Sequence, residues 1–138
     1  MTQEEAQAIK DLLLKDLCAR LPYGLKAKCE KYSFPVTILY AGNDGEVKFK
    51  ETGGIENICT IKSYLFPLSS MTDKQKVEYN SLRDLVPTEQ QCEVGNLLGD
   101  FEFVDNWRSI DYLNANHFDY RGLIEYGLAI DATGLNIY

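Results

Sequence analysis

The spacing of apolar residues changes after residue 24, and this change constrains the fold more than any other feature of the chain. Before it, apolar side chains recur every three or four residues, as along one face of a helix: Ala6, Ile9, Leu13, Leu17 and Leu21. After it, they alternate with polar side chains, as in half-buried strands: Leu25, Ala27, Cys29, Val36, Ile38, Tyr40, Val47 and Phe49. The sequence therefore predicts a helix followed by a sheet that buries the second set on one face.

The ends and the surface pairs of the first helix can also be predicted. Thr2 and Glu5 have the spacing of a capping box, and Gly24 ends the segment. Asp11–Lys15 and Asp16–Arg20 are acid-first pairs four residues apart. We expect both pairs on the exposed face of the helix.

Residues 25–66 contain three to five short strands, rich in β-branched and aromatic residues. Gly42-Asn43-Asp44-Gly45 supplies residues that tolerate positive φ, so a hairpin turn is expected there. No crossover helix fits between the strands, and antiparallel pairing is therefore expected. This pattern favours a meander or a small curled barrel.

A second helix is predicted after this sheet. Thr72 and Gln75 form another capping box, and Pro87 closes the segment. Within it, one helical face is expected to carry Tyr79, Leu82 and Val86.

The remaining part of the chain predicts a loop, a strand, a third helix and a tail. Residues 88–100 are polar and contain two glycines, whereas residues 101–104 suit a short strand. Asp105 can cap a third helix, of which one side carries Trp107, Ile110, Leu113, Asn114 and His117. The tail, residues 122–138, is expected to pack over the core. The prediction is one α+β domain over residues 1–138: an N-terminal helix, a small antiparallel sheet that can curl into a barrel, two further helices and a packed C-terminal tail.

Charge and hydropathy limit the classes of partner. The net charge of −7 opposes binding to nucleic acid, since phosphate backbones repel an acidic protein. The basic side chains on the predicted strands are interpreted as a solvated face: Lys26, Lys28, Lys31, Lys48 and Lys50. No transmembrane helix or secretory signal can be drawn, so a cytoplasmic protein without membrane contact is expected.

No metal or cofactor is expected from the sequence. The cysteines at positions 18, 29, 59 and 92 lack the C-x-x-C spacing of a zinc site, and small buried side chains are their simpler interpretation. Gly42-Asn43-Asp44-Gly45 lacks the Lys-Ser/Thr of a phosphate loop and the further ligands of a calcium loop.

Residues 117–124, here called the C-terminal block, hold the candidate binding residues His117, Asp119, Tyr120 and Arg121. His117 and Asp119 could form an oriented acid–base pair, but no nucleophile is indicated, so no catalytic residue is assigned. Arg121 could bind a carboxylate or phosphate; the alternative is an ion pair with Asp119 or Glu125 that fixes the tail.

Three stretches together suggest a family: residues 12–24, residues 64–72, and residues 112–114 with 117–131. They resemble small uncharacterised proteins encoded by phages, prophages and mobile elements of gut Bacteroides-type bacteria, and the resemblance is most specific at residues 118–124. It implies a bacterial host cell and transfers no functional residue. The leading hypothesis is a non-enzymatic module that binds a host or element-encoded protein. The alternatives are a small hydrolytic or nucleotide-processing enzyme using His117, Asp119 and Arg121, and a nucleic-acid-binding small barrel. The oligomeric state is left open.

Overall fold

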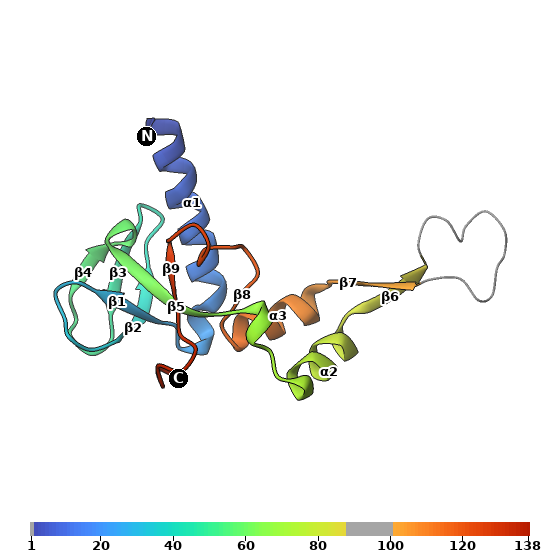
Figure 1. Ribbon diagram of the computed structural model, residues 1–138. Helices are drawn as coiled ribbons and strands as arrows, with labels where there is room; N and C mark the ends of the chain where they lie inside the picture. Colours follow the sequence, from blue (N-terminus) through green and yellow to red (C-terminus); the bar gives the residue numbers. More distant parts are fainter. Residues whose placement is uncertain (1, 88–100) are drawn as a thin grey trace. The chain divides into compact units, whose positions relative to one another are not determined.

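The computed structural model describes residues 2–87 and 101–138. The chain divides into two compact units (Figure 1): a first unit, Met1–Ser70 with Asn114–Tyr138, and a second unit, Met71–Leu113. The single domain over residues 1–138 stays a prediction. No helix within the described ranges is long and apolar enough to cross a membrane.

The first unit combines one long helix with a mixed sheet. The helix is α1 (Gln3–Arg20), and the strands are β1 (Lys26–Cys29), β2 (Val36–Ala41), β3 (Glu46–Phe49), β4 (Ile55–Asn57), β5 (Ile61–Pro67), β8 (Phe118–Asp119) and β9 (Ala129–Asp131). The strand order is β4-β3-β2-β1-β5-β8, and β9 also pairs with β5. This arrangement confirms the α+β class, and the described strands form an open sheet rather than a closed barrel.

The strands predicted between residues 25 and 66 pair antiparallel, as expected. The parallel pairs were not predicted: β8 and β9, from the C-terminal part of the chain, both lie parallel to β5. Phe66 is opposite Phe118, and Tyr64 is opposite Ile130. The tail therefore completes the sheet, in addition to packing over it.

The register prediction is correct for seven of its eight residues, which are buried: Leu25, Ala27, Cys29, Val36, Ile38, Val47 and Phe49. The eighth, Tyr40, is 48% exposed. The cause is an irregularity in the β2–β3 pairing: Ile38 is opposite Phe49, but Tyr40 is opposite Lys48. The extra residue, Leu39, reverses the alternation, so Tyr40 points to solvent.

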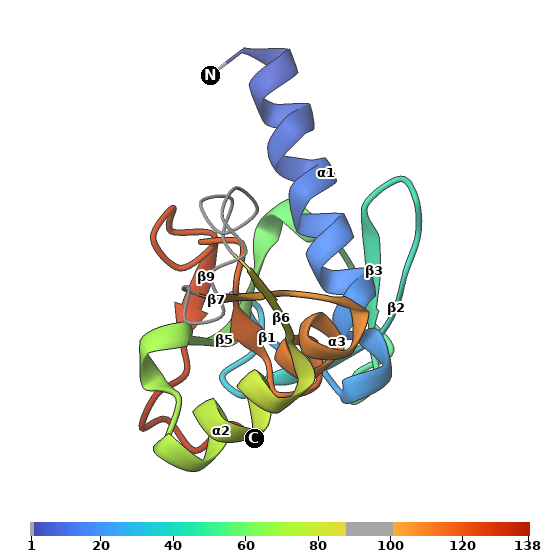
Figure 2. The same cartoon turned by 90° about the vertical axis from the view of Figure 1, so that its right-hand side faces the viewer.

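The ends of α1 follow the sequence signals. The Glu5 backbone N–H donates to the Thr2 hydroxyl at 3.1 Å, and Gly24 ends the segment with φ +71°. In the predicted apolar stripe, Leu17 is buried, whereas Ala6 is exposed. Ala6 lies in the N-terminal turns of α1, which extend away from the sheet (Figure 2).

The second unit contains α2 (Asp73–Leu82), β6 (Asp84–Pro87), β7 (Phe101–Val104) and most of α3 (Trp107–Ala115). The capping box at Thr72 and Gln75 is confirmed, because the hydroxyl accepts from the Gln75 N–H and the Gln75 side chain accepts from the Thr72 N–H. The predicted strand at residues 101–104 is confirmed as β7. The loop predicted at residues 88–100 lies outside the described residues.

Two boundary predictions in this unit are wrong. The second helix ends at Leu82, and Val86 lies in β6 opposite Glu102, because residues 84–87 pair with β7 instead of continuing the helix. Asn106, and not Asp105, caps α3: its side-chain oxygen accepts from the Ser109 N–H at 3.0 Å. Trp107 does not share the buried side of α3, since it is 78% exposed.

Candidate functional site

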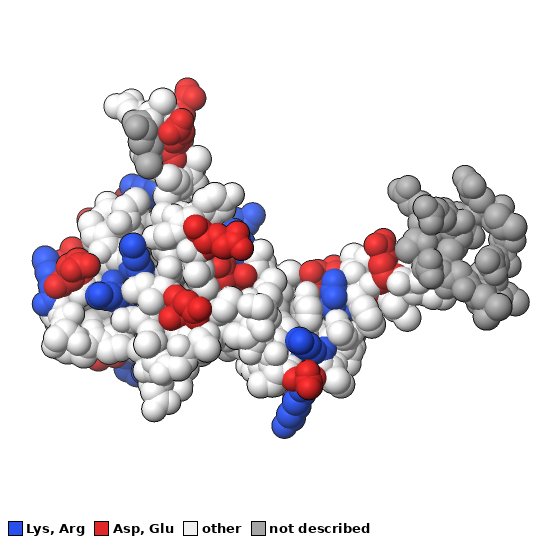
Figure 3. Space-filling view, in the orientation of Figure 1, with Lys and Arg blue, Asp and Glu red and all other residues white. Residues whose placement is uncertain are grey.

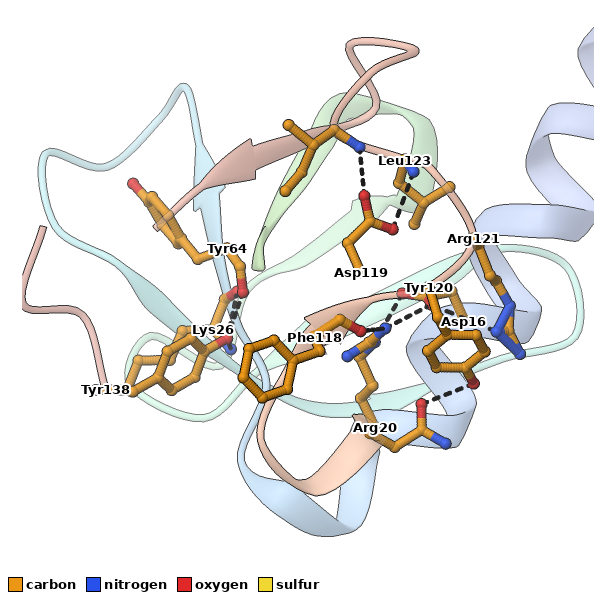
Figure 4. Close-up of polar contacts among 12 residues, drawn as sticks. Asp16, Arg20, Lys26, Tyr64, Phe118, Asp119, Tyr120, Arg121, Leu123 and Tyr138 are labelled. Atoms are coloured by element: carbon orange, nitrogen blue, oxygen red, sulfur yellow. Dashed lines mark hydrogen bonds and ion pairs between the residues drawn. The ribbon is translucent and has the colours of Figure 1, made fainter. Parts of the chain in front are cut away.

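The C-terminal block is placed by the parallel pairing of β8 with β5. The Phe66 N–H donates to the His117 carbonyl at 2.8 Å, and the His117 N–H donates to the Asn114 carbonyl at 3.1 Å. His117 has φ +59°, an uncommon conformation for a residue other than glycine, and it turns the chain from α3 into β8. This turn places Phe118 in the interior next to the C-terminal end of α1 (Figure 4).

Arg20 is the fully buried centre of the site, with 0% of its surface exposed. Its Nε donates to Asp16 Oδ2 at 3.0 Å, and its Nη2 donates to Asp16 Oδ1 at 3.1 Å and to the Phe118 carbonyl at 2.6 Å. The prediction of an exposed Asp16–Arg20 pair is therefore wrong. Two charges without water are stable only when paired and hydrogen-bonded. Here the two side chains pair with each other, and Nη1 of Arg20 has no hydrogen-bond partner among the described residues.

The sequence contains a signal that could have found this pair. Leu13, Asp16, Leu17 and Arg20 follow the spacing i, i+3, i+4 and i+7 of one helical face. An acid and a base on the same face as core leucines predict a buried pair, and a spacing of four residues alone does not.

Arg121 extends the network to Asp16. Its Nη1 lies 3.6 Å from Asp16 Oδ1, so the carboxylate beside Arg121 is that of Asp16. The Tyr120 ring is contacted by both cations: its centroid is 4.6 Å from Cζ of Arg121 and 5.5 Å from Cζ of Arg20. The Tyr120 hydroxyl donates to Asn114 Oδ1 at 2.9 Å. The guanidinium of Arg121 thus ties the C-terminal block to α1.

Asp119 organises the turn that follows β8. Its Oδ1 accepts from the Leu123 N–H at 3.0 Å, and its Oδ2 accepts from the Ile124 N–H at 2.9 Å (Figure 4). Both carboxylate oxygens therefore satisfy backbone groups of the tail. Among the described residues, no hydrogen bond links Asp119 to His117.

His117 is 5% exposed and packs as an aromatic ring. It stacks on Tyr138 with ring centroids 4.0 Å apart and an interplanar angle of 13°. Burial and the Arg20 charge lower the pKa of His117 to about 4, and a hydrogen bond that His117 donates to the Tyr23 backbone opposes this shift by raising the pKa. The ring is therefore neutral at pH 7.

Tyr138 is a residue of this site that the sequence did not predict. Its hydroxyl donates to the Tyr64 carbonyl at 2.8 Å and accepts from the Lys26 N–H at 3.0 Å. Burial raises the pKa of this hydroxyl well above its ordinary value. The end of the tail is thereby attached to β1 and β5.

Two lysines of the predicted basic face contact neighbouring side chains. Lys31 pairs with Glu56, which raises the pKa of Lys31. Lys48 lies beside the exposed Tyr40, with Nζ 5.9 Å from the ring centroid. On the face drawn in Figure 3, Lys and Arg are interspersed with Asp and Glu. This face offers no continuous basic track.

The cysteines are partly as predicted. Cys29 is buried, whereas Cys18 and Cys59 are exposed, and Cys92 lies outside the described residues. Within the described ranges, no group of three or more His, Cys, Asp or Glu side chains could hold a metal ion.

A second candidate site is the two-stranded ribbon of β6 and β7. Leu85 is opposite Phe103, and Pro87 is opposite Phe101. Paired residues of antiparallel strands point to the same side, so Leu85, Phe101 and Phe103 share one face. Their exposed fractions are 57%, 55% and 44%. The sequence predicted β7 but not this pairing, and it therefore missed the exposed apolar face.

Arg83 holds the base of the ribbon. Its Nη2 donates to the Phe103 carbonyl at 2.9 Å, and its Nε lies 3.4 Å from Asp105 Oδ1. Its Cζ lies 4.9 Å from the Tyr79 ring centroid and 5.5 Å from that of Phe103. Tyr79 also donates to Asp105, and burial together with this bond raises the pKa of Tyr79 to about 12. The Arg83 guanidinium thus contacts both the carbonyl and the exposed ring of Phe103.

Comparison with known proteins found no family model, no curated protein and no solved structure that matches this chain.

Proposed function

We propose that this chain is a non-enzymatic protein-interaction module and that its second unit carries the recognition surface. The observation that carries the proposal is the exposed apolar face of the β6–β7 ribbon, formed by Leu85, Phe101 and Phe103. Large apolar side chains that adjoin one another in water commonly mark interaction sites, whereas scattered ones do not. Aromatic side chains fixed before binding also lose little conformational entropy on binding.

The C-terminal block supports this choice over an enzyme. Asp119 binds two backbone N–H groups, Arg121 lies beside Asp16, and His117 is a stacked, neutral ring. These contacts hold the tail on the first unit. A hydrolytic site would need a nucleophile, a base and an orienting group in contact, and these three residues do not form that set.

The family resemblance supports the setting of the proposal. Because the similar proteins are encoded by phages, prophages and mobile elements, we propose that the partner is a protein of the bacterial host or of the element that encodes the chain. The acidic net charge of −7 favours a protein partner over nucleic acid.

A site-specific crosslinking experiment tests the proposal. A photoreactive phenylalanine analogue replaces Phe101 in one full-length variant and Tyr126, an exposed residue of the first unit, in the control variant. Each variant is irradiated in the producing cells, crosslinked proteins are identified by mass spectrometry, and the partner is purified and titrated against the unmodified chain.

The expected result is one partner that crosslinks at position 101 and not at position 126, and that binds the purified chain in titration. No crosslink at position 101, or crosslinks of equal yield at both positions, would contradict the proposed recognition surface. A reaction catalysed by the purified chain and abolished by His117→Asn would instead support the enzyme.

A further inference from the structure

The two faces of the β6–β7 ribbon differ in chemistry. One face carries Leu85, Phe101 and Phe103. The other carries the partners of two pairs, Asp84 with Val104 and Val86 with Glu102, so each strand contributes a carboxylate to it. Asp84 is already 3.7 Å from Arg108, but this ion pair is exposed and contributes little.

The edges of the ribbon can also accept a strand. Among the described strands, β6 and β7 form a sheet of their own, and each has one edge without a neighbouring strand. Such edges present backbone N–H and C=O groups that pair with an added strand. Pro87 lacks an N–H and disfavours pairing along β6, whereas β7 contains no proline, which makes β7 the better edge.

Charge indicates what kind of strand would be added. Residues 71–113 contain nine acidic and four basic side chains, so this unit carries most of the net charge of −7. A second copy of the chain would place two such acidic units together, which like-charge repulsion opposes. A basic partner gains from the same field, and its approach is accelerated at low salt.

We propose that the ribbon binds an extended segment of a basic partner protein, in which aliphatic and Lys or Arg residues alternate, and that the segment adds to β7 as a third strand. Side chains of an added strand point alternately to the two faces. The aliphatic ones would lie beside Phe101 and Phe103, and the basic ones beside Glu102. This inference rests on the proposed function and names the partner chemistry of its recognition surface.

Synthetic peptides provide the first test. The probe is an eight-residue peptide of alternating valine and lysine. One control peptide has glutamate in place of lysine, and another has proline at two central valines, which removes ladder N–H groups. Binding to the full chain is measured by calorimetry and by the fluorescence of Trp107, which is the only tryptophan of the chain.

The valine–lysine peptide is expected to bind, with an affinity that falls as salt concentration rises, and the two control peptides to bind at least about tenfold more weakly. Equal binding of the proline peptide would overturn strand addition. Equal binding of the glutamate peptide would overturn the choice of a basic partner. No binding of the valine–lysine peptide would overturn the inference as a whole.

Variants of the chain provide the second test. Glu102→Lys is expected to weaken binding of the valine–lysine peptide by about threefold or more and to strengthen binding of the glutamate peptide. Glu125→Lys, at an exposed position of the first unit, changes the net charge equally and should leave both affinities unchanged. Leu85→Ser should weaken binding about tenfold, whereas Leu135→Ser should not. Equal effects at the paired positions would indicate unspecific attraction and would overturn the inference.

The outcomes separate this inference from the proposed function. If a partner crosslinks at position 101 but the chain does not bind the peptides, the proposal of an interaction module is supported and the proposal of strand addition is contradicted. A chain that elutes as a dimer, and that becomes a monomer in Leu85→Ser, would show that a second copy covers the ribbon and would also overturn the basic partner.

Discussion

Arg20 donates hydrogen bonds from two nitrogens to the Asp16 carboxylate, at 3.0 and 3.1 Å, and both side chains are buried in the interior of the first unit. The same guanidinium donates to the Phe118 carbonyl, so one side chain of α1 binds both its own helix and β8. Residues 98 positions apart in the chain are thereby joined. This pair therefore connects α1 to β8 within the interior of the first unit.

Arg20→Met is expected to lower the free energy of unfolding by about 3–5 kcal/mol, because the Asp16 charge would stay buried without its main partner. Lys15→Met, on the exposed side of the same helix, should change it by less than about 0.5 kcal/mol. The double variant Asp16→Leu with Arg20→Met should recover part of the loss, since neither buried charge remains. Chemical denaturation monitored by circular dichroism measures all three. A loss in Arg20→Met no larger than in Lys15→Met would contradict the prediction.

The protein should lose stability as the pH falls from about 6.5 to about 4. The pKa of His117 is lowered to about 4 in the fold, from its ordinary value of 6.5, mainly by burial. The unfolded chain therefore binds a proton in this window that the folded chain does not, so this contribution is fully present above pH 6.5 and is lost on acidification. We expect an effect of about 1–3 kcal/mol after allowance for screening.

The pH effect of His117 can be separated from that of the carboxylates with one substitution. His117→Asn keeps a residue that tolerates positive φ and removes the titrating group. The difference in unfolding free energy between the wild type and this variant, measured at pH 7 and pH 4.5, should shrink at the lower pH. A constant difference would mean that the His117 pKa is not lowered in the fold.

The sequence predicts those parts of the fold that are local. The period change after residue 24, the Gly42–Gly45 turn and the Thr72 cap each depend on a few adjacent residues, and the structure confirms them. The exposed Tyr40 could not be predicted, because the irregularity that exposes it exists only in the pairing with β3. β8 and β9 were not predicted either, because residues 118–119 and 129–131 are too few to show an apolar period and their partner strand, β5, is distant in the chain.

The candidate site was predicted less well than the fold. The C-terminal block was singled out for its residue types, and the structure places these residues together at β8. Their partners come from elsewhere: Asp16 and Arg20 from α1, and Tyr138 from the last position. Side-chain contacts between distant segments follow from the packing, which one sequence without its fold does not reveal.

Phe118→Ala should cost about 3–5 kcal/mol, because the ring is buried beside that of Phe66 and its removal leaves a cavity. Phe34→Ala, at an exposed ring, should cost less than about 1 kcal/mol. Deletion of the residues after Asn116 should give an unstable or insoluble protein for the same reason. A soluble truncated protein with an unchanged melting temperature would show instead that the tail is a free recognition segment.

The chain should not bind duplex DNA tightly at physiological salt. The net charge of −7 opposes it, and on the face drawn in Figure 3 the basic side chains are interspersed with acidic ones. Lys31, for example, forms an ion pair with Glu56. A gel-shift titration at several salt concentrations measures this. Submicromolar binding that weakens with added salt would contradict the prediction and would direct attention to Tyr40 and Lys48.

Tyr138→Phe should destabilise the chain by about 1–2 kcal/mol, because it leaves the Tyr64 carbonyl and the Lys26 N–H without their side-chain partner. Hydrogen exchange locates the effect: the Lys26 amide should exchange faster in this variant, and amides of the second unit should not change. Tyr138→Ala should destabilise the chain further, because it also removes the ring that stacks on His117. The pKa of His117 should then rise toward 6.5. Tyr126→Phe, at an exposed tyrosine of the same tail, is the control and should leave all three quantities as they are. If Lys26 protection and the His117 titration were unchanged in Tyr138→Ala, the end of the tail would not be held by this side chain in solution.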